Sequence, residues 1–147
     1  MYSAVDIASI ICSRYQENYG KRIDEMKLHK LLYFVQRESF IQTGKPLFSE
    51  EFEAWKFGPV MTEIRWRYKI NSFPECNIDD VTDKIINKVF DIYSGTRSWS
   101  LSMMSHEEIS WKNARIGVPE GENGSNHISN DDIMADAERV KNLRGSE

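Results

Sequence analysis

One stretch, residues 27–60, constrains the fold of this 147-residue chain more than any other. It begins with apolar residues at helical spacing, Leu28, Leu31, Leu32 and Val35, which predict one buried helix face. A Gly-Lys-Pro run then ends that helix, because proline disfavours a helical conformation in the residue before it. An aromatic segment and a Gly-Pro turn close the stretch. The sequence therefore predicts a helix, a sharp stop and a short extended segment in succession.

The composition is that of an ordinary globular protein, with 40% hydrophobic and 29% charged residues. This length fits a single domain over residues 1–147. Cys12 lies on an apolar helical face, far from Cys76, so we expect a buried, reduced thiol. The first residues lack the features of a signal peptide, and no apolar run approaches the roughly 18 residues of a membrane span. We therefore expect a cytoplasmic protein that does not contact a membrane.

Helical periodicity divides the chain into about six helices, so the predicted fold is mainly α. The first helix should begin after Ser3, with Asp6 completing a capping box, and should end at Gly20. The second should run from about Asp24 to Thr43. Further helices are expected over about 60–73, over 77–93, over 98–116 as one or two segments, and from residue 129 onward with Asp132 in the first turn. One face of the helix over 77–93 should be formed by Val81, Ile85, Ile86, Val89, Phe90 and Tyr93.

Residues 47–57 lose the helical period and carry apolar side chains on both alternating faces. We expect short extended segments here, as a small two-stranded ribbon packed on the helices, because an isolated hairpin is marginal in water. Gly58 and Pro59 should form the turn that follows. The turn-forming run 117–127 predicts a mobile loop.

The charges are unevenly distributed along the chain. Residues 1–69 carry 11 Lys and Arg against 9 Asp and Glu, whereas residues 70–147 carry 8 against 14. A mild dipole of this kind suits a protein partner through electrostatic complementarity, although an ordinary solvated surface accounts for it equally well. It argues against nucleic acid as the main ligand, because phosphate binding generally needs a clustered basic face.

The sequence predicts neither a catalytic residue nor a cofactor or metal site. His106-Glu107-Glu108 resembles the start of a zinc-protease motif, but that motif needs a second histidine where Ser110 stands. No paired-cysteine, phosphate-loop or nucleophile-elbow pattern is present. We expect His106 to make a structural hydrogen bond near Trp111. Only a bound metal or a polar pocket around His106 would favour an enzyme.

The aromatic residues are better candidates for function. Trp66 lies between cationic neighbours, so we predict a partner-binding cluster of Arg65, Trp66, Arg67 and Lys69 that fits an acidic protein surface. Core packing is the alternative for Trp66, and it is the expectation for Trp55 and Trp111. The same basic and aromatic cluster also permits nucleic-acid contacts, which we regard as the weaker interpretation because the charges are few.

Three blocks in this order resemble the Panacea domain, the SocA-like antitoxin family that includes phage-associated proteins. The first block is Lys-Leu-Leu-Tyr-Phe, the second is Thr-Gly-Lys-Pro-Leu-Phe followed by Ala-Trp-Lys-Phe-Gly-Pro-Val, and the third includes His106 and Trp-Lys-Asn-Ala-Arg. Phe57 stands where the family commonly has tyrosine, and Ser110 replaces a proline. The residues that carry the resemblance are Lys30, Leu31, Leu32, Tyr33, Gly44, Pro46, Leu47, Phe48, Ala54, Trp55, Gly58, Pro59, His106, Trp111, Ala114 and Arg115.

This resemblance implies a non-enzymatic antitoxin that binds and neutralises a toxin encoded in the same operon, in a prophage or another mobile element. The alternatives are an adaptor or regulator that binds a host protein such as a protease, and a DNA-binding autoregulator. The resemblance names neither the toxin nor the surface that binds it, and it is compatible with a homo-oligomer.

Overall fold

The computed structural model describes residues 1–145, and it places them in seven helices and one two-stranded antiparallel hairpin. The mainly α class is confirmed, with seven helices in this part of the chain against about six predicted. The elements in chain order are α1 (Ala4–Tyr19), α2 (Glu25–Thr43), β1 (Glu53–Trp55), β2 (Gly58–Val60), α3 (Thr62–Ile70), α4 (Asp80–Tyr93), α5 (Ser98–Ser105), α6 (Ile109–Ala114) and α7 (Asn130–Gly145).

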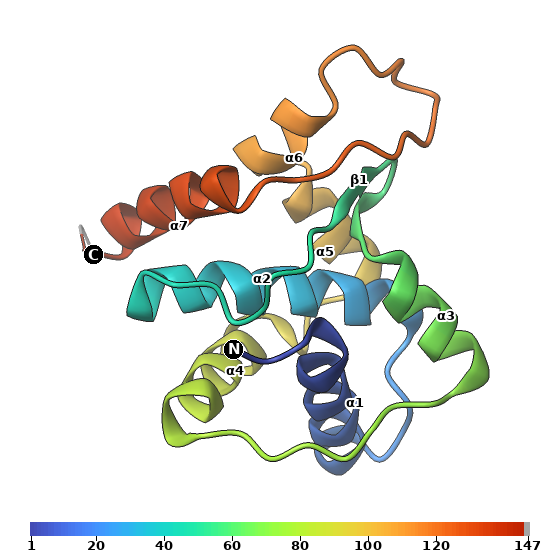
Figure 1. Ribbon diagram of the computed structural model, residues 1–147, viewed down its shortest axis with the longest axis vertical. Coiled ribbons are helices and arrows are strands. Elements are labelled where there is room, and N and C mark those ends of the chain that lie inside the picture. The colour runs from blue at the N-terminus through green and yellow to red at the C-terminus, as the bar shows by residue number, and fades with distance from the viewer. Residues whose placement is uncertain (146–147) are drawn as a thin grey trace.

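Helix α2 forms the centre of the fold. It packs against α1, α3, α4, α5, α7 and β2, and Figure 1 shows α7 on one side of it and α1 and α4 on the other. The predicted apolar residues of α2 are buried, but so are its polar residues His29, Lys30, Gln36, Arg37 and Glu38. A helix surrounded in this way has no solvated face, so each buried polar group needs a partner inside the protein.

The predicted helix ends at the N-terminal half are confirmed. Ser3 and Asp6 form a reciprocal capping box on α1, and Gly20 ends that helix in the left-handed conformation. Asp24 caps α2 by accepting a hydrogen bond from the backbone of Lys27, and Gly44 ends it. These interactions are local in sequence, which is why the sequence alone places these boundaries.

The hairpin forms later in the chain than predicted. Its strands pair Glu53 with Val60 and Trp55 with Gly58, so Lys56 and Phe57 form the turn. Gly58 and Pro59, predicted as the turn, lie in β2. The residues just after α2 are held instead by the side chain of Gln36, which accepts from the backbone of Leu47 and donates to that of Phe48. Because these contacts hold residues 47 and 48, only the last part of the predicted 47–57 segment pairs with another strand.

Two further boundaries differ from the predictions. Helix α4 begins at Asp80, after its cap Asp79, and Val81 is exposed instead of lying on the buried face. The 98–116 region divides into α5 and α6 at His106–Glu108. The break needs no proline, because the carboxylate of Asp136 in α7 accepts hydrogen bonds from the backbone N–H groups of Ile109 and Ser110.

The loop over 117–127 is attached at its end to β1. Ala54 donates a backbone hydrogen bond to Asn126, and Ile128 donates one to Phe52. The side chain of Arg115 also donates to the carbonyls of Glu122 and Asn123. The predicted mobility of the loop stays a prediction. Within residues 1–145, none of the helices is long and apolar enough to cross a membrane.

Candidate functional site

The hairpin is held by side chains from helices on both of its sides. Two donors reach β1: Trp111 Nε1 lies 2.8 Å from the carbonyl oxygen of Trp55, and Arg115 Nη1 lies 2.9 Å from that of Ala54. These residues stand four apart in the chain and therefore follow one another along the same side at the end of α6. The third family block thus fixes the backbone of the second.

Two more donors hold the turn and β2. Ser102 Oγ on α5 donates to the carbonyl oxygen of Phe57 at 2.5 Å, and Lys30 Nζ on α2 donates to that of Pro59 at 3.0 Å. A two-stranded hairpin is marginal by itself. Four side-chain hydrogen bonds from three helical regions therefore give this one a fixed position on the domain.

Gly58 allows the hairpin to approach α2 and α5 closely. Its φ angle is +114°, a conformation that favours glycine, and it lies directly against two side chains. A β-carbon added there would stand 2.8 Å from Lys30 Cε and would collide with Ser105 Oγ. The Gly-Pro pair is thus needed for close packing between elements, which explains why it lies in a strand.

Replacing Gly58 by alanine should lower the free energy of unfolding by about 2–4 kcal/mol, because backbone strain adds to a steric clash. Gly44→Ala is the matched control: its φ is also positive, at +74°, but nothing lies within 4 Å of an added β-carbon. It should cost only about 1 kcal/mol. Urea denaturation of both variants measures the difference. Ser105→Ala in the Gly58→Ala background should restore part of the loss, and equal losses at the two glycines would contradict the packing role.

A hydrogen bond with the backbone of Lys56 acts on the ring of His106, near Trp111 as predicted, but Nε2 of that ring takes no part in a hydrogen bond. That atom is buried and has no partner within residues 1–145. The ring stacks instead on Trp111, with centroids 4.2 Å apart and planes inclined by 17°. Burial lowers the pKa of His106, so its ring is neutral at pH 7. Core packing was expected for Trp55 and Trp111. Both side chains are half-buried, and that of Trp111 packs against the hydrophobic core.

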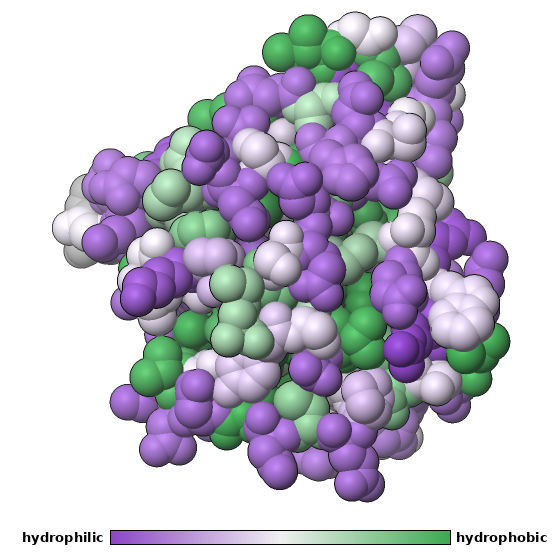
Figure 2. All heavy atoms as spheres, viewed as in Figure 1, coloured by the Kyte–Doolittle hydropathy of each residue, from purple (hydrophilic) through white to green (hydrophobic). Residues whose placement is uncertain are grey.

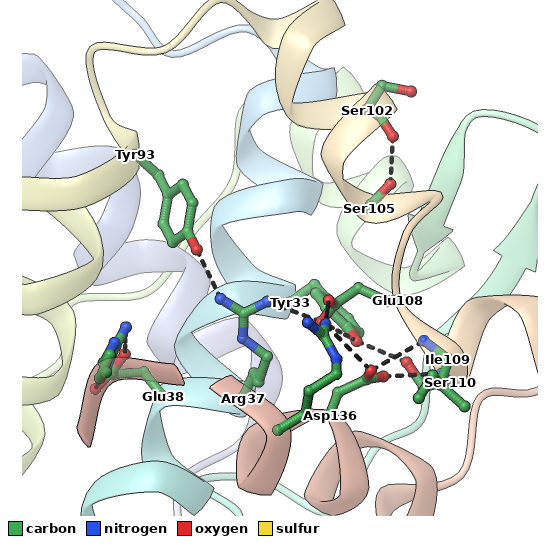
Figure 3. Close-up of polar contacts among 12 residues, drawn as sticks. Tyr33, Arg37, Glu38, Tyr93, Ser102, Ser105, Glu108, Ile109, Ser110 and Asp136 are labelled. Carbon is green, nitrogen blue, oxygen red and sulfur yellow. Dashed lines mark hydrogen bonds and ion pairs between the residues drawn. The ribbon is translucent and has the colours of Figure 1, made fainter. Parts of the chain in front are cut away.

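A buried polar network lies further along the same face of α2, and Figure 3 shows its centre at Glu108. One carboxylate oxygen of Glu108 accepts from Tyr33 at 3.0 Å and from Arg37 at 2.8 Å. The other accepts from Arg139 of α7 at 2.9 Å. Arg37 also donates to the hydroxyl of Tyr93 at 2.6 Å. The network therefore connects α2, α4, α7 and the α5–α6 junction.

The charges in this network balance one another. Burial opposes the positive charge of Arg37, but the adjacent carboxylate of Glu108 outweighs it, and the pKa of the guanidinium is raised. Burial also raises the pKa of Tyr33, which keeps its phenol as a hydrogen-bond donor. At the C-terminal end of α7, Arg144 makes a two-pronged ion pair with buried Glu38 at 2.9 and 2.8 Å. These contacts have a structural role, since every charge in them is matched inside the protein.

The predicted cluster on α3 is only partly available to a partner. Trp66 is 57% exposed, as a binding residue requires, while Ile64 fills the core beneath the helix. Arg65 pairs with Glu25 at 3.6 Å, and Arg67 pairs with Glu63 at 3.2 Å. Two of its cations are thus already neutralised by acids of the same chain.

The described residues contain no group of three or more His, Cys, Asp and Glu side chains arranged to hold a metal ion. Cys12 is partly rather than fully buried, and desolvation raises the pKa of its thiol to about 11. A thiol with this pKa stays protonated near neutral pH, so Cys12 is a weak nucleophile.

A protein-family model described as antitoxin SocA-like, Panacea domain, matches residues 28–112. This match covers more than half of the chain and includes three of the four side chains that fix the hairpin, those of Lys30, Ser102 and Trp111. The chain belongs to the SocA-like Panacea domain family. Helices α1 and α7 lie outside the matched part of this Panacea domain protein.

One curated relative also matches part of the chain. Over 38 residues the chain is 50% identical to Antitoxin SocA of Caulobacter vibrioides (strain NA1000 / CB15N). The matched residues are 26% of this chain and 20% of that relative, so the chain matches only one fifth of its length. No solved structure gives a significant match to the chain.

Proposed function

We propose that this Panacea domain protein is a non-enzymatic antitoxin that binds a protein toxin and neutralises it. The observation that carries the proposal is the family match over residues 28–112. The relative named Antitoxin SocA supports the same class of function over a shorter segment. We further propose that the pair is encoded together in a prophage or other mobile element and acts in the cytoplasm.

The proposed mechanism is inhibition by burial of toxin surface, without turnover. The polar groups at the centre of this domain support it, because the buried charges around Glu108 are paired with one another. A binding protein of this kind needs a rigid framework and an exposed surface, and the network provides the first of these. Neutralisation should therefore depend on complex formation.

Co-expression with the protein encoded by the neighbouring gene tests this function. Induction of that protein alone should arrest growth, and this chain should restore it. A neighbour that is harmless without this chain would contradict the antitoxin function and would favour an adaptor for a host protein.

Trp66 belongs to the surface that we propose for partner binding, with Arg65, Arg67 and Lys69 around it. Trp66→Ala should weaken binding of the neighbouring protein about tenfold, because exposed tryptophans often anchor interfaces. The free energy of unfolding should stay within about 1 kcal/mol, as expected for a surface change. Ile92→Ala, at an exposed position on α4, is the matched control and should leave affinity unchanged. Calorimetry measures binding, and a large loss of stability in Trp66→Ala would show a core role instead.

A further inference from the structure

The turn of the hairpin presents an aromatic side chain to solvent. Phe57 is 44% exposed and meets Trp99 of α5, 56% exposed, with ring centroids 5.5 Å apart at an angle of 60°. Met103 stands one helical turn after Trp99 and is also exposed. Figure 2 shows one face of the molecule, on which hydrophobic residues form several patches among hydrophilic ones. Lys56, Phe57, Trp99 and Met103 together make what we term the hairpin-tip surface.

This surface is exposed and at the same time rigidly held. The hydrogen bond from Ser102 fixes the carbonyl of Phe57, and the contact of Gly58 with α2 and α5 fixes the residue after it. Binding through a residue whose backbone is already fixed loses less conformational entropy, so more of the contact energy appears as affinity. Packing of the domain does not require a large apolar residue at a solvent-exposed turn, whereas an interface uses one as an anchor.

The charges around the hairpin-tip surface are mainly positive and free to meet a partner. Lys56 lies with Nζ 5.3 Å from the centre of the Phe57 ring, and Arg97 precedes Trp99 at the start of α5. Neither cation has a carboxylate within ion-pair distance among residues 1–145. Asp24 is the nearby acid on the α5 side, and its oxygens already accept from Ser98 and the backbone of Lys27. Acidic groups on a partner would complement these unpaired cations.

We propose that the hairpin-tip surface is the main docking site for the toxin, and that it binds an acidic segment carrying an apolar anchor residue. This inference rests on the proposed antitoxin function and adds to it the surface and the chemistry of the partner. The α3 cluster adjoins the site, since Arg65 lies 5.1 Å from the ring of Trp55. It contributes the smaller part of the affinity.

The test measures affinity between the purified protein and the purified product of the neighbouring gene. The double variant Phe57→Ala with Trp99→Ala should weaken binding at least 100-fold, as expected for two central anchors. Lys56→Glu should weaken it about tenfold, mainly through slower association at low salt. Met134→Ala and Lys88→Glu are the matched controls, because both positions are exposed and lie on α7 and α4. They should stay within threefold of the wild-type affinity.

Thermal unfolding of each variant shows whether weaker binding comes from the missing side chain or from a destabilised fold. The melting temperatures of the hairpin-tip variants should lie within a few degrees of the wild-type value. Wild-type affinity in the double variant would overturn this inference while leaving the antitoxin function intact. A loss confined to Trp66→Ala would also overturn it, by placing the anchor on α3. Absence of binding by the wild-type protein would overturn the antitoxin function, and this inference with it.

Discussion

Replacing Glu108 by alanine should lower the free energy of unfolding by about 3–5 kcal/mol. The variant leaves Arg37, whose side chain is only 5% exposed, with a buried charge that has lost its carboxylate. Removing one partner of a buried ion pair is costly because the remaining charge cannot reach water. Tyr33 and Arg139 would lose hydrogen bonds at the same time. Urea denaturation followed by circular dichroism measures the change.

The neighbouring residue supplies the control for this prediction. Glu107 also pairs with a cation, Lys112 at 3.6 Å, but its side chain is 80% exposed. Glu107→Ala should therefore change stability by no more than about 0.5 kcal/mol, because exposed ion pairs contribute little. Glu108→Gln, which keeps size but not charge, should fall between the two. Similar small losses at positions 107 and 108 would contradict the role given to the buried network.

Lys30 should contribute a gain in stability as the pH rises from about 7 to about 10.5, which the raised pKa values of Cys12 and Tyr33 oppose at the upper end of this range. Burial lowers the pKa of its ammonium from 10.5 to about 7, and it has no carboxylate partner within ion-pair distance in the described chain. Between these two pH values the unfolded chain holds a proton at Lys30 that the folded chain has released. More protons on the unfolded state mean that stability increases with pH, by roughly 3–5 kcal/mol over the whole window. Below about pH 7 the cost of burying the charge is fully present.

Lys30→Met should abolish this rise, since methionine has no proton to release. Chemical denaturation at pH 6.5 and pH 9.5 in wild type and variant isolates the effect, because every other titrating group is common to both. Lys88→Met, at an exposed position of α4, should leave the wild-type pH dependence unchanged. Parallel pH profiles for wild type and Lys30→Met would show that Lys30 keeps its proton in the folded state.

The parts of the fold that depend on neighbours in the chain could be predicted from the sequence. The capping box of Ser3 and Asp6 and the glycine stops at Gly20 and Gly44 are interactions of this kind. The helix class followed from periodicity for the same reason. The family blocks were also visible in the sequence, although their common task of fixing the hairpin was not.

The polar network could not be predicted, because its members are far apart in the chain. Arg37 and Glu108 are separated by 71 positions, and nothing in their local sequence marks them as partners. The apolar residues of α2 predicted one buried face, whereas neighbours on every side bury the polar residues as well. Asp136 likewise caps a helix from another part of the chain, because its carboxylate accepts hydrogen bonds from the backbone of Ile109 and Ser110.

The candidate surface was predicted in part. Trp66 is exposed, as expected for a partner-binding residue. It was predicted to bind because its neighbours are cationic. Two of these cations, Arg65 and Arg67, form ion pairs within the chain, which neutralise much of that charge. The predicted turn at Gly58 and Pro59 would have placed Phe57 inside an extended segment. The observed register moves it to the tip of the hairpin.

Native mass spectrometry of a titration between this protein and the purified toxin tests the central claim most directly. Stoichiometric neutralisation predicts one complex that saturates at a fixed whole-number ratio, in which both chains keep their intact masses. Absence of a complex would contradict the claim. So would a toxin that is cleaved or covalently modified by a small fraction of an equivalent, because that result would require turnover.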